Sequence, residues 1–147
     1  MDRKDFIASC GFVCLGAIPL GVFATSCSSS VYYAQHIRTK ESALIPLSEF
    51  NDVQPDGTTT QRPFVVFTPE GQRYPIGVYA LANGTYSALL LRCTHRSCEL
   101  QPQTTYLVCP CHGSEFTIHG KVQGPPALSD LHVFPVTVEG GNIAIRL

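Results

Sequence analysis

Charged residues are scarce in this sequence, and neither sign is in excess. Asp, Glu, Lys and Arg make up 14% of the 147 residues, and the formal net charge is −1. A nucleic-acid-binding surface needs a basic excess, so this balance argues against that class of function. The apolar content of 44% is sufficient for a buried core, and the length suits one domain with a short appendage.

Helical patterns are absent after residue 43, and tryptophan is absent throughout, whereas the 11 prolines and 12 glycines indicate many turns. Asn83-Gly84 predicts a two-residue hairpin turn between two strands. Runs rich in β-branched and aromatic residues predict strands at 63–68, 74–81, 85–92, 105–109, 114–118 and 131–138, and at the C-terminal end. We therefore expect an all-β antiparallel sandwich or barrel of about nine or ten short strands.

The N-terminal segment has the features of an export signal. Arg3 and Lys4 form a basic start, and the 19 residues from Phe6 to Ala24 carry no charge. This run is slightly shorter than the about 20 residues that a membrane-spanning helix needs, and glycine and proline interrupt it. "DRKDFI" resembles a twin-arginine signal with lysine in place of the second arginine, a signal used by proteins that fold around a cofactor before export.

"ATSCSSS" resembles a lipobox, which predicts cleavage before Cys27 and a lipid on that cysteine. We therefore expect a signal at 1–27, a linker at 28–42 and a folded domain at 43–147. An uncleaved transmembrane anchor is the alternative to a lipid. Both interpretations predict a domain on the extracytoplasmic (periplasmic) face of the cell membrane, tethered to that membrane.

Seven cysteines is a high and odd number, and four of them lie in two matched segments, "RCTHRSCEL" (92–100) and "VCPCHGSEF" (108–116). Each segment also carries a histidine. A c-type haem site needs C-x-x-C-H, and the second segment is one residue too short for it. A tetrahedral zinc site needs four ligands and would leave two thiols without a role. A Rieske [2Fe–2S] cluster uses two cysteines on one iron and two histidines on the other.

"CTHRSC" followed by "CPCHGS" resembles the cluster-binding loops of Rieske iron–sulfur proteins from cytochrome bc complexes, whose pattern is C-x-H-x-x-C and then C-x-C-H-G-S. "GPPAL" (124–128) resembles the proline-rich third loop of that family. The resemblance covers about residues 92–128. It implies one [2Fe–2S] cluster and a Rieske-like fold with a small cluster-binding subdomain inserted between strands.

Position by position, the resemblance implies which residues hold the cluster. Cys93 and Cys109 would bind the inner iron, and His95 and His112 would bind the outer iron. Cys98 and Cys111 would form a disulfide that joins the two loops, which fits an oxidising compartment. Ser114 would donate a hydrogen bond to a bridging sulfide.

The resemblance also implies a function. The protein would be an electron-transfer subunit of a quinol–cytochrome c reductase-like oxidoreductase, and not a complete enzyme alone. His95 and His112 would be the quinol-facing, redox-linked proton sites, and the electron would pass to a cytochrome. Phe116 stands where relatives usually have a tyrosine that donates to a ligand sulfur, which predicts a lower potential that suits menaquinol better than ubiquinol.

Other functions remain open from the sequence. A Rieske carrier or a subunit of a non-bc oxidoreductase is the main alternative, and a structural zinc module is another. A ring-hydroxylating oxygenase component is disfavoured, because those proteins lack the disulfide pair and are not exported. Arg96 and Ser97 occupy positions where the family usually has an apolar residue and glycine. A charge beside the histidines would alter quinol docking or favour a different partner, although an exposed arginine without a role is an equal alternative.

Overall fold

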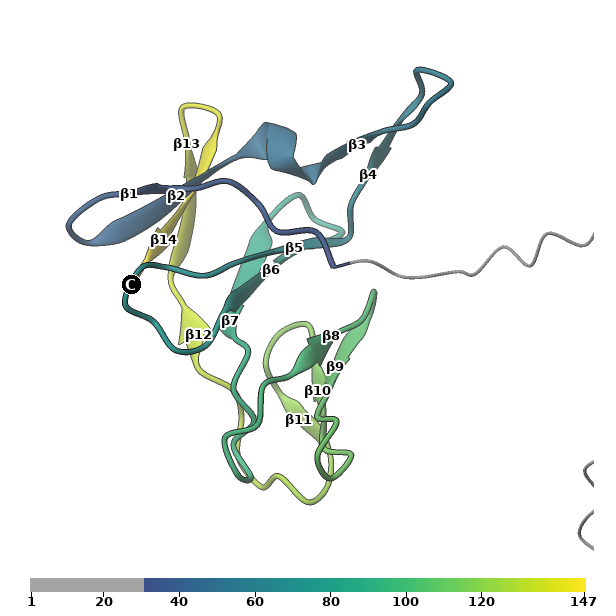
Figure 1. Ribbon diagram of the computed structural model, residues 1–147, viewed down its shortest axis with the longest axis vertical. Coiled ribbons are helices and arrows are strands. Elements are labelled where there is room, and N and C mark those ends of the chain that lie inside the picture. Colours follow the sequence, from purple (N-terminus) through teal and green to yellow (C-terminus); the bar gives the residue numbers. More distant parts are fainter. Residues whose placement is uncertain (1–30) are drawn as a thin grey trace, which may run out of the picture. The chain divides into compact units, whose positions relative to one another are not determined.

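Short strands, one turn of 3-10 helix and the loops that connect them make up residues 31–147, the part of the chain that this computed structural model describes (Figure 1). The predicted signal and Cys27 lie outside the described residues. No helix among residues 31–147 has the length and apolar character needed to cross a membrane. In chain order the elements are β1 (Ile37–Arg38), β2 (Ser42–Pro46), η1 (Leu47–Phe50), β3 (Asn51–Val53), β4 (Thr59–Gln61), β5 (Phe64–Phe67), β6 (Ile76–Ala80), β7 (Tyr86–Leu90), β8 (Gln101–Pro102), β9 (Tyr106–Val108), β10 (Glu115–Thr117), β11 (Val122–Gly124), β12 (Val133–Phe134), β13 (Val136–Glu139) and β14 (Asn142–Arg146).

The named strands pair in antiparallel fashion and build three four-stranded sheets and a separate β3–β4 hairpin. The first sheet has the order β1-β2-β14-β13, the second β12-β7-β6-β5, and the third β11-β10-β9-β8. The third sheet lies in the chain between β7 and β12 of the second sheet, and it forms the lower lobe in Figure 1. The predicted all-β fold with a subdomain inserted between strands is confirmed.

Two buried clusters of side chains hold these sheets together. The first cluster contains Ile45, Phe67 and Ile145 and packs the first sheet against one face of the second. The second cluster joins the other face of the second sheet to the inserted subdomain. Its members include Leu89, Leu107, Phe116, Cys93 and Cys109. Because side chains alternate between the two faces of a strand, the second sheet can supply both clusters. The cluster that fastens the subdomain therefore also encloses two of the predicted ligand cysteines.

Each strand predicted from the sequence is present, but the described residues contain more strands than expected. The segment at 131–138 divides into β12 and β13 at Pro135, which has no N–H to donate to a ladder. Most of the extra strands are very short or polar, as in "NDV" of β3 and "TTQ" of β4, whereas β2 has five residues and buries Ala43 and Ile45. The hairpin at Asn83-Gly84 forms, but its connection runs from Leu81 to Thr85, longer than the predicted two residues, with Leu81 N donating to Thr85 O at 2.9 Å.

Residues just before β1 pack onto the edge of β5. The backbone N–H of Val66 donates to Tyr32 O at 2.9 Å, and Ala34 N–H donates to Val66 O at 2.8 Å. The guanidinium of Arg62 lies 4.0 Å from the Tyr32 ring centroid, a cation–π contact. The compact unit begins at Val31, so the packed part of the chain extends into the segment expected to be a linker.

Candidate metal centre

Two loops of the inserted subdomain carry the predicted ligands and fold in the same way. In the first loop (93–98), Cys93 N–H donates to Cys98 O at 2.8 Å, and Ser97 N–H donates to Cys93 O at 2.9 Å. In the second loop (109–114), Cys109 makes the same two bonds at 2.8 and 2.9 Å to the residues five and four positions later. The fifth residue of each loop is left-handed, with φ of 57° at Ser97 and 78° at Gly113. The repeated hydrogen bonds and this backbone conformation give the two loops matching turns.

Ser97 is the single non-glycine residue with a positive φ among residues 31–147. A side chain in this conformation costs roughly 1–2 kcal/mol, so Gly113 adopts it more easily. Two neighbours hold Ser97 in place. The Tyr74 hydroxyl donates to the Ser97 carbonyl at 2.7 Å, and Arg92 Nε donates to Ser97 Oγ at 3.0 Å. Ser97, at a position where the family usually has glycine, therefore adopts a backbone conformation that glycine would adopt without strain.

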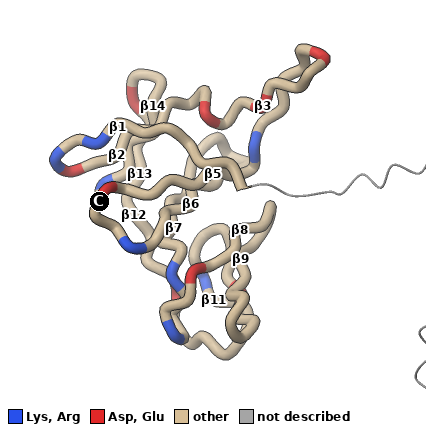
Figure 2. The backbone as a smooth tube through the Cα atoms, viewed as in Figure 1, with Lys and Arg blue, Asp and Glu red and all other residues tan. Residues whose placement is uncertain are grey.

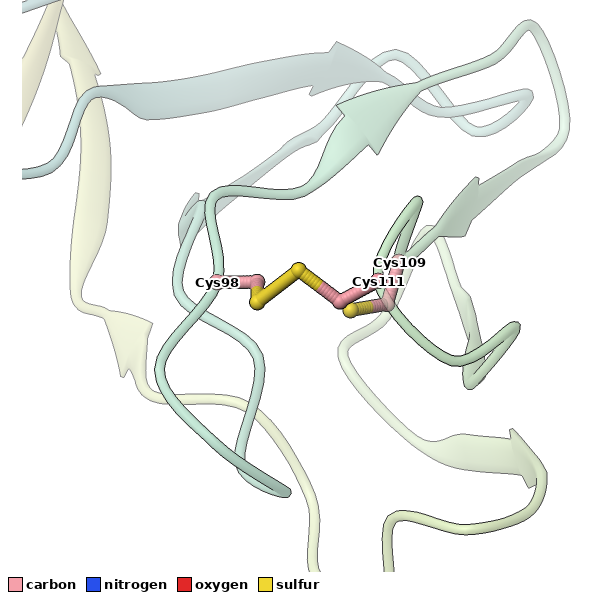
Figure 3. A group of neighbouring side chains, drawn as sticks. All are labelled: Cys98, Cys109 and Cys111. Carbon is pink, nitrogen blue, oxygen red and sulfur yellow. A yellow bond between two sulfur atoms is a disulfide. The ribbon is translucent and has the colours of Figure 1, made fainter.

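A disulfide joins the two loops. It links Cys98 to Cys111, the pair that the family resemblance predicted, with their Cα atoms 6.5 Å apart (Figure 3). The Cys109 sulfur lies within 4.8 Å of both bridged sulfurs. Because Cys98 and Cys111 are bonded to each other, neither is a free thiolate, and these three residues do not form a metal site by themselves. The bridge fixes the separation of the loops.

Cys93 and Cys109 are free thiols, and each is 1% exposed. Burial raises the pKa of the Cys109 thiol, the backbone N–H groups of Cys111 and His112 lower it, and the neighbouring Cys93 raises it. Burial disfavours a thiolate unless a cation lies beside it. These two thiols are buried, and backbone donors point at one of them, which suits metal ligands. A catalytic nucleophile would need to be accessible to solvent.

The two predicted histidine ligands face each other. The ring centroids of His95 and His112 are 4.9 Å apart, with an interplanar angle of 81°. His95 is half-buried and His112 is exposed. His95 Nδ1 is buried and has no hydrogen-bond partner among the described residues. A buried ring nitrogen without a partner is costly, and a metal ion would satisfy it.

The proline loop (124–128) is tied to the second loop through Ser114. Ser114 is fully buried, and its Oγ accepts a hydrogen bond from Ala127 N–H at 3.0 Å. Because the hydroxyl oxygen acts as the acceptor, the hydroxyl proton remains available to a further acceptor. Thr94 Oγ1 in the first loop donates to the Ser129 carbonyl at 2.7 Å, just beyond the proline loop. All three loops are thus joined around the thiols and imidazoles.

Asp130 closes the base of the proline loop. Its carboxylate accepts hydrogen bonds from Val122 N–H at 2.9 Å and from Lys121 Nζ at 2.7 Å. The hydrogen bond from Lys121 lowers the pKa of Asp130, with the Val122 N–H as the second cause. Neither Asp130 nor Tyr74 belongs to a motif that the sequence reveals. No local pattern marks Tyr74, because its partner Ser97 is 23 positions further along the chain.

The donor set fits a Rieske cluster. It combines two buried thiols, two facing imidazoles with one nitrogen unpartnered, and a disulfide that uses the remaining cysteines of the loops. The family model described as "Rieske [2Fe-2S] domain" matches residues 43–135 of the sequence. The chain belongs to the Rieske [2Fe–2S] family. Its domain therefore binds a [2Fe–2S] cluster, as the loop motifs predicted.

Several Rieske proteins resemble this one. The iron–sulfur subunit of the cytochrome b6-f complex from Synechococcus sp. (strain JA-3-3Ab) is 36% identical over 66 residues, which are 44% of this chain and 37% of that protein. This Rieske chain thus matches well under half of the length of that relative. The ferredoxin subunit of 3-phenylpropionate/cinnamic acid dioxygenase from Shigella flexneri is 34% identical over 93 residues, 56% of this chain and 88% of the ferredoxin.

A solved structure shares the fold. The cyanobacterial plasma membrane Rieske protein PetC3 from Synechocystis PCC 6803 superposes with a TM-score of 0.53 at 33% identity. The match covers 58% of this chain and 87% of the chain of that protein. The similarity supports the Rieske fold deduced from the sheet order and the two loops.

Proposed function

We propose that this Rieske protein is a membrane-tethered, extracytoplasmic electron-transfer subunit that accepts an electron from a quinol and passes it to a cytochrome. The observation that carries the proposal is the unequal exposure of the ligand set. Both thiols are buried, whereas His112 is exposed at the same site. The similarity to iron–sulfur subunits of cytochrome b6-f complexes supports a bc-type partner.

We propose Cys93, His95, Cys109 and His112 as the cluster ligands. A bound [2Fe–2S] cluster supplies a one-electron redox centre. The chain excludes water from the thiol side through the second buried cluster of side chains. On the other side, the exposed His112 ring can accept a hydrogen bond from a quinol hydroxyl. Ser114 can donate its hydroxyl proton towards the cluster, since its oxygen already accepts from Ala127 N–H.

A Rieske carrier in another type of oxidoreductase is the second candidate. The similarity to a dioxygenase ferredoxin subunit, which extends over 88% of that ferredoxin, favours it. The disulfide between Cys98 and Cys111 favours the bc-type function, because oxygenase components lack this pair. A structural zinc module accounts for neither the family match nor the proline loop.

The membrane attachment belongs to the proposal as well. We propose a lipid on Cys27, which follows from the lipobox-like "ATSCSSS", or else an uncleaved N-terminal helix. The similarity to a plasma membrane Rieske protein supports an attachment to the membrane. Mass spectrometry of the mature N-terminus distinguishes the two anchors, since a lipidated Cys27 and an intact Met1 differ in mass.

The test of the function is quinol oxidation in membranes. Membranes from cells that lack this protein should fail to reduce the cytochrome when a menaquinol analogue is added. The full chain should restore the reduction, and purification of the tagged chain in mild detergent should recover haem-containing subunits. Unimpaired cytochrome reduction without this protein would refute the proposal.

A further inference from the structure

Three arginines lie beside the first loop without a carboxylate partner. Arg73, Arg92 and Arg96 are exposed, and none of them forms an ion pair among residues 31–147. We call these three residues the basic strip. Two acidic residues lie near the strip in the chain: Glu70, three positions before Arg73, and Glu99, which faces Arg92 across an isolated β-bridge. Neither is in ion-pair contact with an arginine of the strip, and two acids offset at most two of the three positive charges.

Tyr74 organises the strip. The guanidinium carbon of Arg73 lies 5.3 Å from the Tyr74 ring centroid, and that of Arg92 lies 5.8 Å from it. The Tyr74 hydroxyl donates to the backbone of Ser97, the residue after Arg96. In Figure 2, blue segments lie along the lower left side and on the lower lobe, with red segments beside some of them. Contacts with Tyr74 therefore position Arg73 and Arg92, and the strip ends at Arg96 in the first loop.

We infer that the basic strip is the docking surface for a redox partner protein with an acidic surface. This inference rests on the proposed electron-transfer function and names the chemistry of its partner. The net charge of the whole chain is −1, so the chain as a whole would not attract an acidic protein. A local positive patch steers such a partner and orients it, which raises association rates by about 10–10³ at low salt.

The position of the basic strip beside a proposed cluster ligand indicates that its occupant is an acidic protein and not a small anion. Arg96 is adjacent to His95, so a partner that contacts the strip sits beside the proposed outer-iron ligand, where electron transfer is short-ranged. Arginines stacked on an aromatic ring lose less side-chain freedom on binding than lysines would, which suits a specific protein interface. An anionic membrane surface is the competing occupant and forms an arm of the test.

The first experiment uses small oxidants of opposite charge on the reduced full chain with its cluster. One electron leaves the protein and converts hexacyanoferrate(III) to hexacyanoferrate(II), or tris(phenanthroline)cobalt(III) to the cobalt(II) complex. In the double variant Arg73→Glu, Arg96→Glu, the ratio of anionic to cationic oxidation rates should fall about tenfold or more at low salt. A substitution that lowers the reduction potential of the cluster speeds oxidation by both reagents. The ratio of the two rates therefore cancels the effect of a changed potential.

The matched control is the double variant Arg38→Glu, Arg146→Glu, which has the same net charge change on the first sheet. Its rate ratio should stay near that of the parent. The effect of the strip variant should shrink at ionic strengths above 0.1 M, where the Debye length is about 10 Å or less. Equal ratios for the two double variants would overturn the inference.

The second experiment needs no electron transfer. A fluorescently labelled oligoglutamate peptide should bind the full chain at low salt, and the strip variant, but not the control variant, should lose this binding. Phosphatidylglycerol vesicles serve as the membrane probe. Strip-dependent binding of the vesicles, or peptide binding that the strip variant retains, would overturn the inference. Neither experiment involves a quinol, so a failure of the proposed quinol oxidation is distinguishable from a failure of the docking surface.

Discussion

The hydroxyl of Tyr74 donates a hydrogen bond of 2.7 Å to the backbone carbonyl of Ser97, across 23 positions of the sequence. Ser97 is left-handed, with φ of 57°, and the next residue is the bridged Cys98. A residue from the β5–β6 connection thus supports a strained turn in the cluster-binding loop. Serine in this conformation is strained, whereas the family's usual glycine would not be, so the hydrogen bond from Tyr74 matters because position 97 is serine.

The contact predicts a coupling between the two residues. Tyr74→Phe removes the donor but keeps the ring, and should lower the free energy of unfolding by about 1 kcal/mol. In a Ser97→Gly background the same change should cost less, since glycine adopts the turn without strain. Denaturant unfolding of the four proteins in this cycle measures the coupling. Identical costs in both backgrounds would mean that Tyr74 does not support the conformation of Ser97.

The disulfide should protect the cluster more than the β framework. Replacing Cys98 and Cys111 together by alanine releases the constraint between two loops 13 residues apart, worth about 3 kcal/mol in a chain-entropy model. Visible absorbance should decay faster in the presence of an iron chelator, while the far-ultraviolet circular dichroism of the strands persists. The expectation would be contradicted if the variant lost its cluster no faster than the parent and only when the strands unfolded.

Phe116 provides a test of redox tuning. The ring is fully buried in the same cluster of side chains as Cys93 and Cys109. We expect a tyrosine hydroxyl at this position to reach the sulfur of a proposed ligand. Phe116→Tyr should raise the reduction potential by roughly tens of millivolts, because a donor to sulfur stabilises the more negative reduced state. Phe134→Tyr adds a hydroxyl on β12, in the first buried cluster, as a control and should leave the potential unchanged. Protein-film voltammetry measures both, and an unchanged Phe116→Tyr potential would remove the argument for menaquinol.

The ion pair at the base of the proline loop predicts a pH dependence. Its partner Lys121 lowers the pKa of Asp130, and Asp130 raises the pKa of Lys121. Because the folded pKa of Asp130 is depressed, its contribution to stability is complete above the ordinary value of about 3.9 and is lost as the pH falls through the lower folded value. Lys121→Met should raise the carboxyl pKa of Asp130 in an NMR titration. The change Lys40→Met, away from this loop, should not alter it, and equal shifts in both variants would contradict the assignment.

The sequence predicted most of the site because the chemistry of the site is local. Cys93 and Cys98 lie within one short segment, as do Cys109 and Cys111, so the spacing marks both loops as candidate metal-binding segments. The spacing left zinc and an iron–sulfur cluster open, and the resemblance to the Rieske family supplied the expected ligand set and disulfide. The fold class followed from β-rich segments between turn residues. The short strands β3, β4 and β8 were not predicted. A segment of two or three mostly polar residues has no strand pattern of its own and becomes a strand only by pairing with a neighbouring strand. The contact of Tyr74 with Ser97 was equally hidden, because tertiary packing brings these residues together.

The most direct test of the central claim is pulsed EPR of the reduced, purified full chain, together with metal analysis. We expect two irons per chain and couplings from two histidine nitrogens, which selective labelling of histidine with nitrogen-15 should change. Alanine at Cys93, His95, Cys109 or His112 should abolish the signal, whereas alanine at the exposed His119 should leave it intact. One zinc and no iron per chain, or a reduced cluster without histidine nitrogen couplings, would contradict the account.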